Sequence, residues 1–381
     1  MGRLALHHPL LASRIDRWHT AAGDGLELAR LVAAQVRATG RHHLGEPLLA
    51  ALEDVRHRHR GHDAFLDAYL DCILARRQNR FGNQTYLALP LLDQILADPS
   101  SGLGPERLSA LLVADVIRHE ARPASLERTG PTTQRKRIQH AARILAAIGP
   151  DSCPMVPRTT AGEWLALTVQ PVSTEHDEYF FIRALQTHEM VFTTLTAELH
   201  RATRALRHGR IGAATAAVGR ANVVFERATL LFRMVATMRA ADFHAFRVHT
   251  DGASAIQSEA YKRFELACGR PAAARLASDA FTNVPVVRAE ASRQDNLSDA
   301  YLDLCREGRV DPAAGAALEA ATAELEAAHQ RWKTTHHGLA SRILDEAPGS
   351  GHTTGAPYLR QCLGNRLFTT ATPDDRARLA S

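Results

Sequence analysis

The sequence predicts an all-α fold, a bundle of packed helices. Alanine, leucine, arginine and glutamate, all good helix formers, are abundant, and apolar residues recur at three- and four-residue spacing over long segments. The alternation of apolar and polar residues that is typical of strands is scarce. With 381 residues, of which 45% are hydrophobic, the chain can bury the core of one large domain or two medium ones.

Periodicity and capping residues give the expected helices in order. They cover residues 8–37, 46–80, 86–97, 105–121, 133–148, 176–207, 211–238, 254–268, 271–281 and 313–344. Proline and glycine interrupt the pattern at 98–102, 149–157 and 348–349. The stretch 150–172 is expected to be an irregular connection between an N-terminal helical portion and the C-terminal half.

Cysteine usage and hydropathy limit the class of protein. The five cysteines are scattered and never form a Cys-x-x-Cys pair, which favours reduced thiols and excludes both a cysteine zinc site and covalent haem attachment. No apolar run approaches the ~18 residues of a membrane span, and the N-terminus lacks the pattern of a signal peptide. A cytoplasmic protein without a membrane partner is therefore expected.

The formal net charge of +5 is spread along the chain apart from two arginine-rich clusters, at 56–60 and 135–137. A nucleic-acid-binding protein usually concentrates its basic residues in one stripe and interleaves aromatic residues, which make up only 6% here. The two clusters are interpreted as solvated helix faces, and no nucleic-acid partner is expected.

His336 is the first candidate for a functional residue. It lies on the apolar face of the expected helix 313–344, whereas His337 falls about 100° away, and a loop of small and hydroxyl-bearing residues follows at 349–355. Haem iron requires a neutral imidazole presented from an apolar wall. The alternative is a histidine satisfied within the core, and His329, one heptad earlier on nearly the same face, fits the pattern equally.

Two further segments carry candidate residues. The helix that begins at His176 presents Phe181 and Leu185 on one face, either as a wall for an aromatic substrate or as ordinary core. Arg247 ends an aromatic helical segment and enters a loop of small residues. Its planar guanidinium could bind a substrate carboxylate, or it could simply cap helix carbonyls.

Together these segments resemble the tryptophan 2,3-dioxygenase family. Residues 176–190 are similar to the family's "HDE…F…HQT.EL" helix, 246–258 to its "FR…QS" segment, and 332–355 to its "WRFRH…GTGGSSG" segment. Residues 83–97 are similar to its N-terminal "TYGGYL" segment. The resemblance divides the chain into an extra N-terminal region (1–82), the family-like segment (83–97), an inserted region (98–172) and a haem-binding core (173–381).

The resemblance implies a haem-binding helical bundle with extra N-terminal and inserted helices. Haem b would be the cofactor, O2 and an aromatic amino acid the reactants, and a dimer or tetramer of identical subunits the assembly. It makes His336 the proximal iron ligand, with His188, Ser254 and Gly351 as further cofactor contacts. The implied substrate contacts are Phe181, Arg247 and Ser350, together with Tyr86 and Leu87, which in the family reach a neighbouring subunit's pocket.

Two positions depart from the family pattern. Leu185 stands where the family has a histidine that hydrogen-bonds the indole N–H, and Phe243 stands where a tyrosine hydroxyl assists the substrate carboxylate. Leucine can neither donate nor accept a hydrogen bond, so selectivity for a free indole N–H should weaken. His188 lies three residues beyond Leu185, about 4.5 Å along the helix, and cannot take the same place.

The resemblance implies insertion of O2 into the indole C2=C3 bond of tryptophan or a derivative, which gives an N-formylkynurenine-type product in tryptophan catabolism. The changes at Leu185 and Phe243 motivate one alternative, a haem-dependent mono-oxygenase of a substituted aromatic amino acid in secondary metabolism. A second alternative, of another class, is a helical binding protein without catalytic activity.

Overall fold

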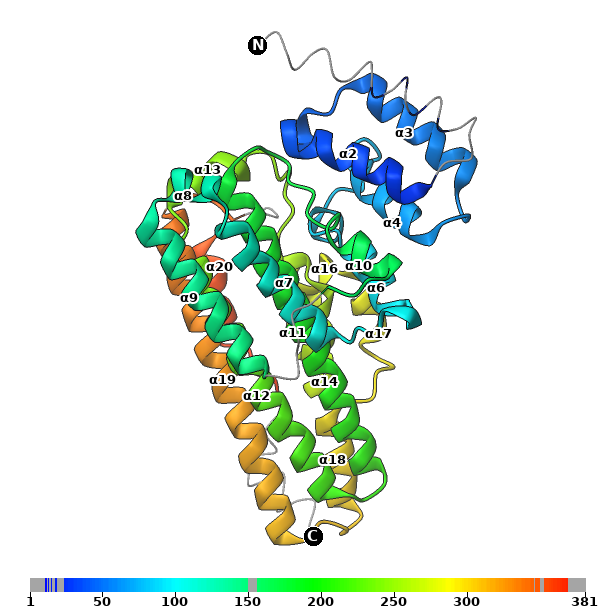
Figure 1. Cartoon of the computed structure of the whole chain (residues 1–381). Coiled ribbons are helices and arrows are strands. Elements are labelled where there is room, and N and C mark those ends of the chain that lie inside the picture. Colours follow the sequence, from blue (N-terminus) through cyan, green and yellow to red (C-terminus); the bar gives the residue numbers. More distant parts are fainter. Residues whose placement is uncertain are drawn as a thin grey trace. The chain divides into compact units, whose positions relative to one another are not determined.

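The computed structural model describes residues 24–149, 156–345, 347–349 and 353–368, together with residues 11, 13, 15 and 18. Every regular element in these residues is helical and none is a strand, which confirms the all-α class (Figure 1). The chain forms two compact units. Unit 1 comprises Met1–Ala142, Pro150–Gln186 and Thr237–Ala255; unit 2 comprises Arg143–Gly149, Thr187–Ala236 and Ile256–Ser381.

Unit 1 holds the N-terminal helices, most of α9 and the first third of α11. Its elements are α2 (Gly25–Thr39), η1 (Arg41–His43), α3 (Glu46–His59), α4 (Ala64–Ile73), α5 (Asn83–Tyr86), α6 (Leu89–Ala97), η2 (Pro99–Ser101), α7 (Pro105–Glu120), α8 (Pro123–Thr129), α9 (Pro131–Ile148), α10 (Thr160–Leu165), the start of α11 (His176–Arg207) and α13 (Ala240–Arg247).

Unit 2 holds the remainder of α11 and the C-terminal helices. Its other elements are α12 (Ile211–Val235), α14 (Glu259–Cys268), α15 (Ala273–Ala277), α16 (Asp279–Thr282), α17 (Pro285–Glu290), α18 (Leu297–Arg306), α19 (Pro312–Leu344) and α20 (Ala356–Cys362). The short η3 (Ala255–Gln257) spans the border between the two units. No helix in the described part of the chain has the length and apolar character to cross a membrane.

The long helices were predicted almost to the residue. Helix α11 has the expected bounds, and α7, α12 and α19 differ from expectation by no more than three residues at either end. Their starts carry strong local signals, such as Asp311, whose side chain accepts a hydrogen bond from the Ala314 N–H at 2.9 Å. A capped start followed by many turns with one apolar face leaves little ambiguity.

The expected helix 46–80 was wrong, because the chain breaks into α3 and α4. Gly61 takes a left-handed conformation at φ +85°, and the Asp63 carboxylate accepts hydrogen bonds from the N–H groups of Phe65 and Leu66 at 2.9 and 3.1 Å. This carboxylate caps a new helix start. After α4 the chain forms turns rather than continuing as a helix to residue 80.

Other expected helices are also interrupted where a new helix begins. Asp24 caps α2 with a 2.9 Å bond from Leu26 N–H, so the expected helix 8–37 is not continuous. Ser258 caps α14, and Ser278 separates α15 from α16, which divides the segments expected at 254–268 and 271–281. The expected irregular stretch 150–172 contains α10, capped by Thr159.

In unit 1, the end of α2 is fixed against the segment that precedes α11. Gly40 has φ +78°, and a Cβ there would lie 2.5 Å from the Val172 carbonyl oxygen. The backbone N–H groups of Arg41 and His42 donate to the carbonyls of Pro171 and Val172, at 2.8 and 3.1 Å. Glycine is therefore required by both conformation and close approach.

The buried Arg41 side chain extends these connections. Its Nη1 donates to the carbonyl oxygens of Cys72 at 3.1 Å and Thr85 at 2.9 Å. It also lies 3.4 Å from Gln170 Oε1. One guanidinium therefore links η1, the end of α4, α5 and the segment before α11.

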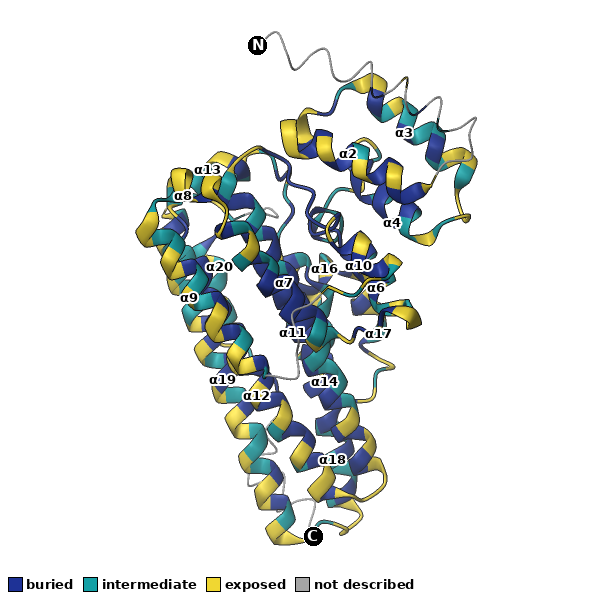
Figure 2. Ribbon diagram, in the orientation of Figure 1, coloured by how far each residue is buried: buried dark blue, intermediate teal, exposed yellow. Residues whose placement is uncertain are grey.

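In unit 2, α12 and α19 run parallel and pack along their length (Figure 1). Asn222 Nδ2, in the middle of α12, donates to the Ala321 carbonyl at 3.1 Å, and Arg342 donates to the Ala236 carbonyl at 2.8 Å where both helices end. Figure 2 shows each helix buried on one side and exposed on the other. The buried sides carry the aromatic residues of the candidate site.

Candidate functional site

His336 lies in a group of aromatic rings in unit 2, contributed by α11, α12 and α19. Its imidazole stacks on Phe232 with ring centroids 5.0 Å apart and planes 20° apart, and it lies 5.7 Å from the Trp332 ring. His188 joins from α11, 4.9 Å from Phe232 and 6.4 Å from Trp332. We call His188, Phe232, Trp332 and His336 the aromatic cluster.

The surroundings of His336 keep its imidazole neutral. Burial, together with smaller contributions from charge repulsion by His188 and His337, lowers the pKa of His336 to about 4. Its ring makes no hydrogen bond to another described residue. A neutral ring nitrogen without a hydrogen-bond partner is a suitable metal ligand.

His329, the competing histidine on α19, has a different environment. It is fully buried, its Nε2 lies 2.8 Å from the Tyr261 hydroxyl, and its Nδ1 lies 3.7 Å from the Glu326 carboxylate. His329 is thus a core histidine that Tyr261 holds through Nε2, whereas its Nδ1 has no hydrogen-bond partner among the described residues. The two histidines share a helix face but differ in their partners, which sequence position alone could not reveal.

In unit 1, the structure brings together the predicted aromatic wall and the predicted carboxylate-binding arginine. Phe181 lies 5.6 Å from Phe243 and 5.3 Å from Phe246, ring centroid to ring centroid. The Arg247 guanidinium carbon lies 5.8 Å from the Phe243 ring centroid, within the range of a cation–π contact. Arg247 is half-buried, and this desolvation lowers its pKa from the ordinary value. A guanidinium beside apolar rings is suited to bind an amino-acid carboxylate.

Other predicted contacts lie on α11, on α13 and in the loop after α13. Leu185 is half-buried on α11, one turn after Phe181, and Ser254 is half-buried in the loop between α13 and η3. Ser350 and Gly351 lie outside the described residues. Phe243 is positioned on α13, one turn before Arg247.

Tyr86 and Leu87, which are expected to reach a neighbouring subunit, have partners within their own chain. Both are buried in their own chain, with 2% and 1% of their surface exposed. The Tyr86 hydroxyl donates to Glu178 Oε1 at 3.3 Å, and the Leu87 carbonyl accepts from Gln186 Nε2 at 2.8 Å. Glu178 and Gln186, both on α11, take up these two polar groups.

Sequence reasoning missed a buried ion-pair network at the start of α11. Arg137, 1% exposed, makes a bidentate contact with Asp177 at 2.6 and 2.7 Å and donates to Glu120 at 3.1 Å. Arg183 donates to Asp115 at 2.7 Å. Charged residues on otherwise apolar helix faces could have indicated buried ion pairs. Their partners, however, lie 40 and 68 residues away in the chain, so one sequence does not show which residues pair.

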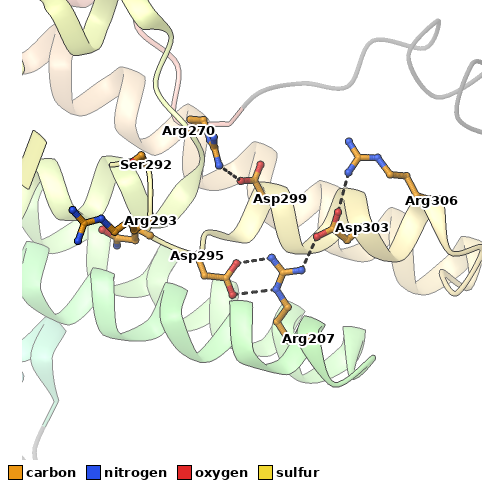
Figure 3. A pocket seen from close by; sticks show the side chains of 9 residues that line it. Arg207, Arg270, Ser292, Arg293, Asp295, Asp299, Asp303 and Arg306 are labelled. Atoms are coloured by element: carbon orange, nitrogen blue, oxygen red, sulfur yellow. Dashed lines mark hydrogen bonds and ion pairs between the residues drawn. The ribbon is translucent and has the colours of Figure 1, made fainter. Parts of the chain in front are cut away.

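A polar surface pocket of about 440 Å³ lies elsewhere in unit 2 (Figure 3). Arg207 pairs there with Asp295 at 2.5 Å and Asp303 at 2.6 Å, and Arg270 pairs with Asp299 at 3.3 Å. None of the predicted site residues lines it. The charges pair with one another across the pocket, so it lacks the apolar lining that an aromatic substrate needs.

Comparison with known proteins finds similarity to one enzyme family. The sequence model of the family described as tryptophan 2,3-dioxygenase matches residues 165–292. A tryptophan 2,3-dioxygenase of Anaeromyxobacter sp. is 29% identical over 254 residues, which is 56% of this chain and 93% of the relative. A Polaromonas sp. relative of the same name is 26% identical over 287 residues, 65% of this chain and 95% of the relative.

A third relative, the tryptophan 2,3-dioxygenase of Pseudomonas aeruginosa, is 26% identical over 232 residues, 52% of this chain and 81% of the relative. Between 81% and 95% of each relative therefore aligns with 52–65% of this chain. The matched region contains α11 and α13, which carry the aromatic wall and Arg247. The chain is therefore similar to the tryptophan 2,3-dioxygenases, a family of oxidoreductases, over residues 165–292 in the family model and over 52–65% of its length in these relatives.

Proposed function

We propose that this protein is a haem-dependent dioxygenase that inserts O2 into the indole C2=C3 bond of tryptophan or a tryptophan derivative, giving an N-formylkynurenine-type product. The observation that carries the proposal is the neutral, half-buried imidazole of His336 within the aromatic cluster. The relatives named tryptophan 2,3-dioxygenase support the choice of reaction.

The residues present fit haem b. Within the described residues, Trp332 Nε1 is buried without an acceptor and its ring lies 5.7 Å from the His336 imidazole, so a candidate iron ligand and an unused N–H donor occur in the same cluster. A buried N–H without an acceptor costs about 1–3 kcal/mol, which a cofactor with acceptor groups would offset. His336 would ligate the iron, and His188, Ser254 and Gly351 would contact the cofactor.

When bound, haem supplies the activation of O2. The chain's own residues orient the substrate: Arg247 binds the carboxylate, Phe181 contacts the aromatic ring, and Ser350 holds the ammonium group. The apolar rings around His336 exclude water from the reacting atoms. The route requires no base for the indole proton, so Leu185 does not prevent it.

A second candidate is mono-oxygenation of a substituted aromatic amino acid in secondary metabolism. The apolar side chains of Leu185 and Phe243 favour it, because both remove a hydrogen-bonding group that the family directs at the substrate. Phe243 packs on Phe181 at 5.6 Å, so the wall near Arg247 is aromatic rather than polar. A ring that carries a substituent instead of a free N–H would meet no unsatisfied polar group there.

Product mass tests the proposal. The purified protein, reduced and exposed to 18O-labelled O2, is given tryptophan and a panel of ring-substituted analogues. Gain of two labelled oxygen atoms supports the dioxygenase, and gain of one supports the mono-oxygenase. Absence of product with any analogue, while the haem spectrum stays intact, would contradict both.

The proposal includes a cytoplasmic homo-oligomer, a dimer or a tetramer. The family resemblance supports it, although Tyr86 and Leu87 are occupied within their own chain. Light scattering coupled to size-exclusion chromatography measures the assembly directly. A monomer at micromolar concentration would contradict this part.

A further inference from the structure

The inserted region and the start of α11 bring two histidines and a glutamate together in unit 1. His119 and Glu120 end α7, and His176 is the first residue of α11. Each offers one ligand atom, and these atoms all lie within 4.8 Å of one another. None of the three has a role in the proposed dioxygenase reaction.

The polar atoms of this group are buried and unsatisfied. Both ring nitrogens of His119, Nε2 of His176 and Oε2 of Glu120 have no hydrogen-bond partner among the described residues, and Glu120 is 0% exposed. The distance between His176 Nε2 and Glu120 Oε1, 3.6 Å, is longer than a hydrogen bond. Each buried polar atom without a partner costs about 1–3 kcal/mol, so a bound ion that these atoms ligate would stabilise the site.

We propose that His119, Glu120 and His176 form a binding site for a divalent transition-metal ion, with Zn²⁺ the best match. Two imidazoles and one carboxylate are a donor set that zinc accepts, with a solvent molecule as the fourth ligand. Tetrahedral coordination separates ligand atoms by roughly 3.3 Å, so ligand atoms that lie within 4.8 Å of one another would move together by at most about 1.5 Å on binding.

Neighbouring residues orient these three side chains, in the way that the residues around a metal site orient its ligands. The His119 ring stacks on Tyr179 with centroids 4.0 Å apart and planes 5° apart, and it stacks on His176 at 4.7 Å. Arg137 donates to Glu120 Oε1 at 3.1 Å, which leaves Oε2 for the ion. The bidentate Asp177 contact of Arg137 offsets the guanidinium charge.

Electrostatics agree with the geometry. Burial lowers the pKa of His119 to about 4, so its ring is neutral at physiological pH and can ligate. Burial raises the pKa of Glu120, but His176 and Arg137 outweigh it and hold the pKa below the ordinary value, which keeps the carboxylate charged. The ion would tie α7 to the helix that carries Phe181 five residues later.

The group of His42, His43 and His249 also has its ligand atoms within 4.8 Å of one another, but it is a weaker candidate. The Arg76 guanidinium contacts His42 directly and pairs with Asp251. His42 and His43 are exposed. The Arg76 guanidinium therefore occupies the His42 ring nitrogen that an ion would need.

Zinc titration of the full-length protein tests the site. After dialysis against a chelator, Zn²⁺ binding is followed by isothermal calorimetry in the wild type, His119→Ala, His176→Ala and Glu120→Gln. We expect one equivalent in the wild type and an increase of at least about tenfold in Kd in each variant. Glu120→Gln keeps an acceptor for Arg137, and far-UV circular dichroism confirms that each variant is folded.

His208→Ala and His249→Ala serve as controls and should bind Zn²⁺ as the wild type does. X-ray absorption at the zinc edge should show two imidazole ligands at about 2.0 Å. No binding by the wild type, an unchanged Kd in His119→Ala and His176→Ala, or loss of binding in His249→Ala would each overturn the proposal.

Discussion

The imidazole of His336 stacks on Phe232, with ring centroids 5.0 Å apart and an interplanar angle of 20°. This contact fixes the ring plane from the α12 side, while burial keeps the ring neutral. An aromatic wall that both orients an imidazole and prevents its protonation is suited to hold an iron ligand.

Replacement of His336 by alanine should therefore abolish the Soret band of the purified, haem-reconstituted protein. His337→Ala, at the next position on α19, is the matched control and should retain the band. His329→Ala should also retain it but lower the melting temperature, because it removes the partner of the Tyr261 hydroxyl. An unchanged Soret band in His336→Ala would refute the ligand assignment.

Arg247→Ala should raise the KM for an amino-acid substrate by roughly 10- to 150-fold, since a charge-assisted hydrogen bond contributes about 1.5–3 kcal/mol. Turnover of a substrate analogue without a carboxylate, such as tryptamine, should change little. Arg239→Ala, at an exposed arginine paired with Asp242, is the control. Equal losses with tryptophan and tryptamine would show that Arg247 does not bind the carboxylate.

Leu185→His restores a polar side chain one turn after Phe181. We expect it to raise the kcat/KM ratio of tryptophan over 1-methyltryptophan by at least about tenfold, because a site with a hydrogen-bonding group rejects an analogue that leaves that group unpaired. Leu185→Met, an apolar replacement of similar volume, should keep the wild-type ratio. If both variants behave alike, residue 185 does not face the indole nitrogen.

Gly40→Ala should destabilise the fold by more than about 1 kcal/mol, because the residue has φ +78° and the new Cβ would lie 2.5 Å from the Val172 carbonyl oxygen. Gly219→Ala, within α12 and with no atom within 4 Å of its Cβ position, should instead stabilise by about 0.5–1 kcal/mol. Urea denaturation measures both changes. Similar shifts of the two midpoints would be inconsistent with the close approach at Gly40.

Asp115 should make the fold sensitive to acid. Burial raises its pKa, but the ion pair with Arg183 and the hydrogen bond from Tyr179 outweigh burial and lower the pKa from 3.8 to about 2. The stabilisation, roughly 2 kcal/mol, is complete above pH 4 to 5 and is lost as the pH falls through about 2. Asp115→Asn should lower stability at pH 7 and flatten this dependence. Glu127→Gln, at an exposed position, is the control and should leave the pH dependence of stability unchanged. Acid titration followed by circular dichroism measures this dependence.

The sequence predicts the long helices well because each repeats one apolar face over many turns. It fails where a single side chain overrides a helical pattern, as Asp63 does by capping α4 after Gly61. The residues of the candidate site were predictable where they share one helix, as Trp332 and His336 do. The Arg137–Asp177 pair was not, because its partners lie 40 residues apart and only the packed fold brings them together.

The Arg41 guanidinium, bonded to the carbonyls of Cys72 and Thr85, determines how far the chain can be shortened. The N-terminal helices are absent from the family pattern, so a shortened chain that starts at Gly82 is an obvious variant to express. Such a truncation would remove the donor that satisfies Thr85, beside Tyr86 and Leu87 in the same buried segment. Residues 24–81 are thus an integral part of the fold, and the truncated chain should accumulate as insoluble aggregate.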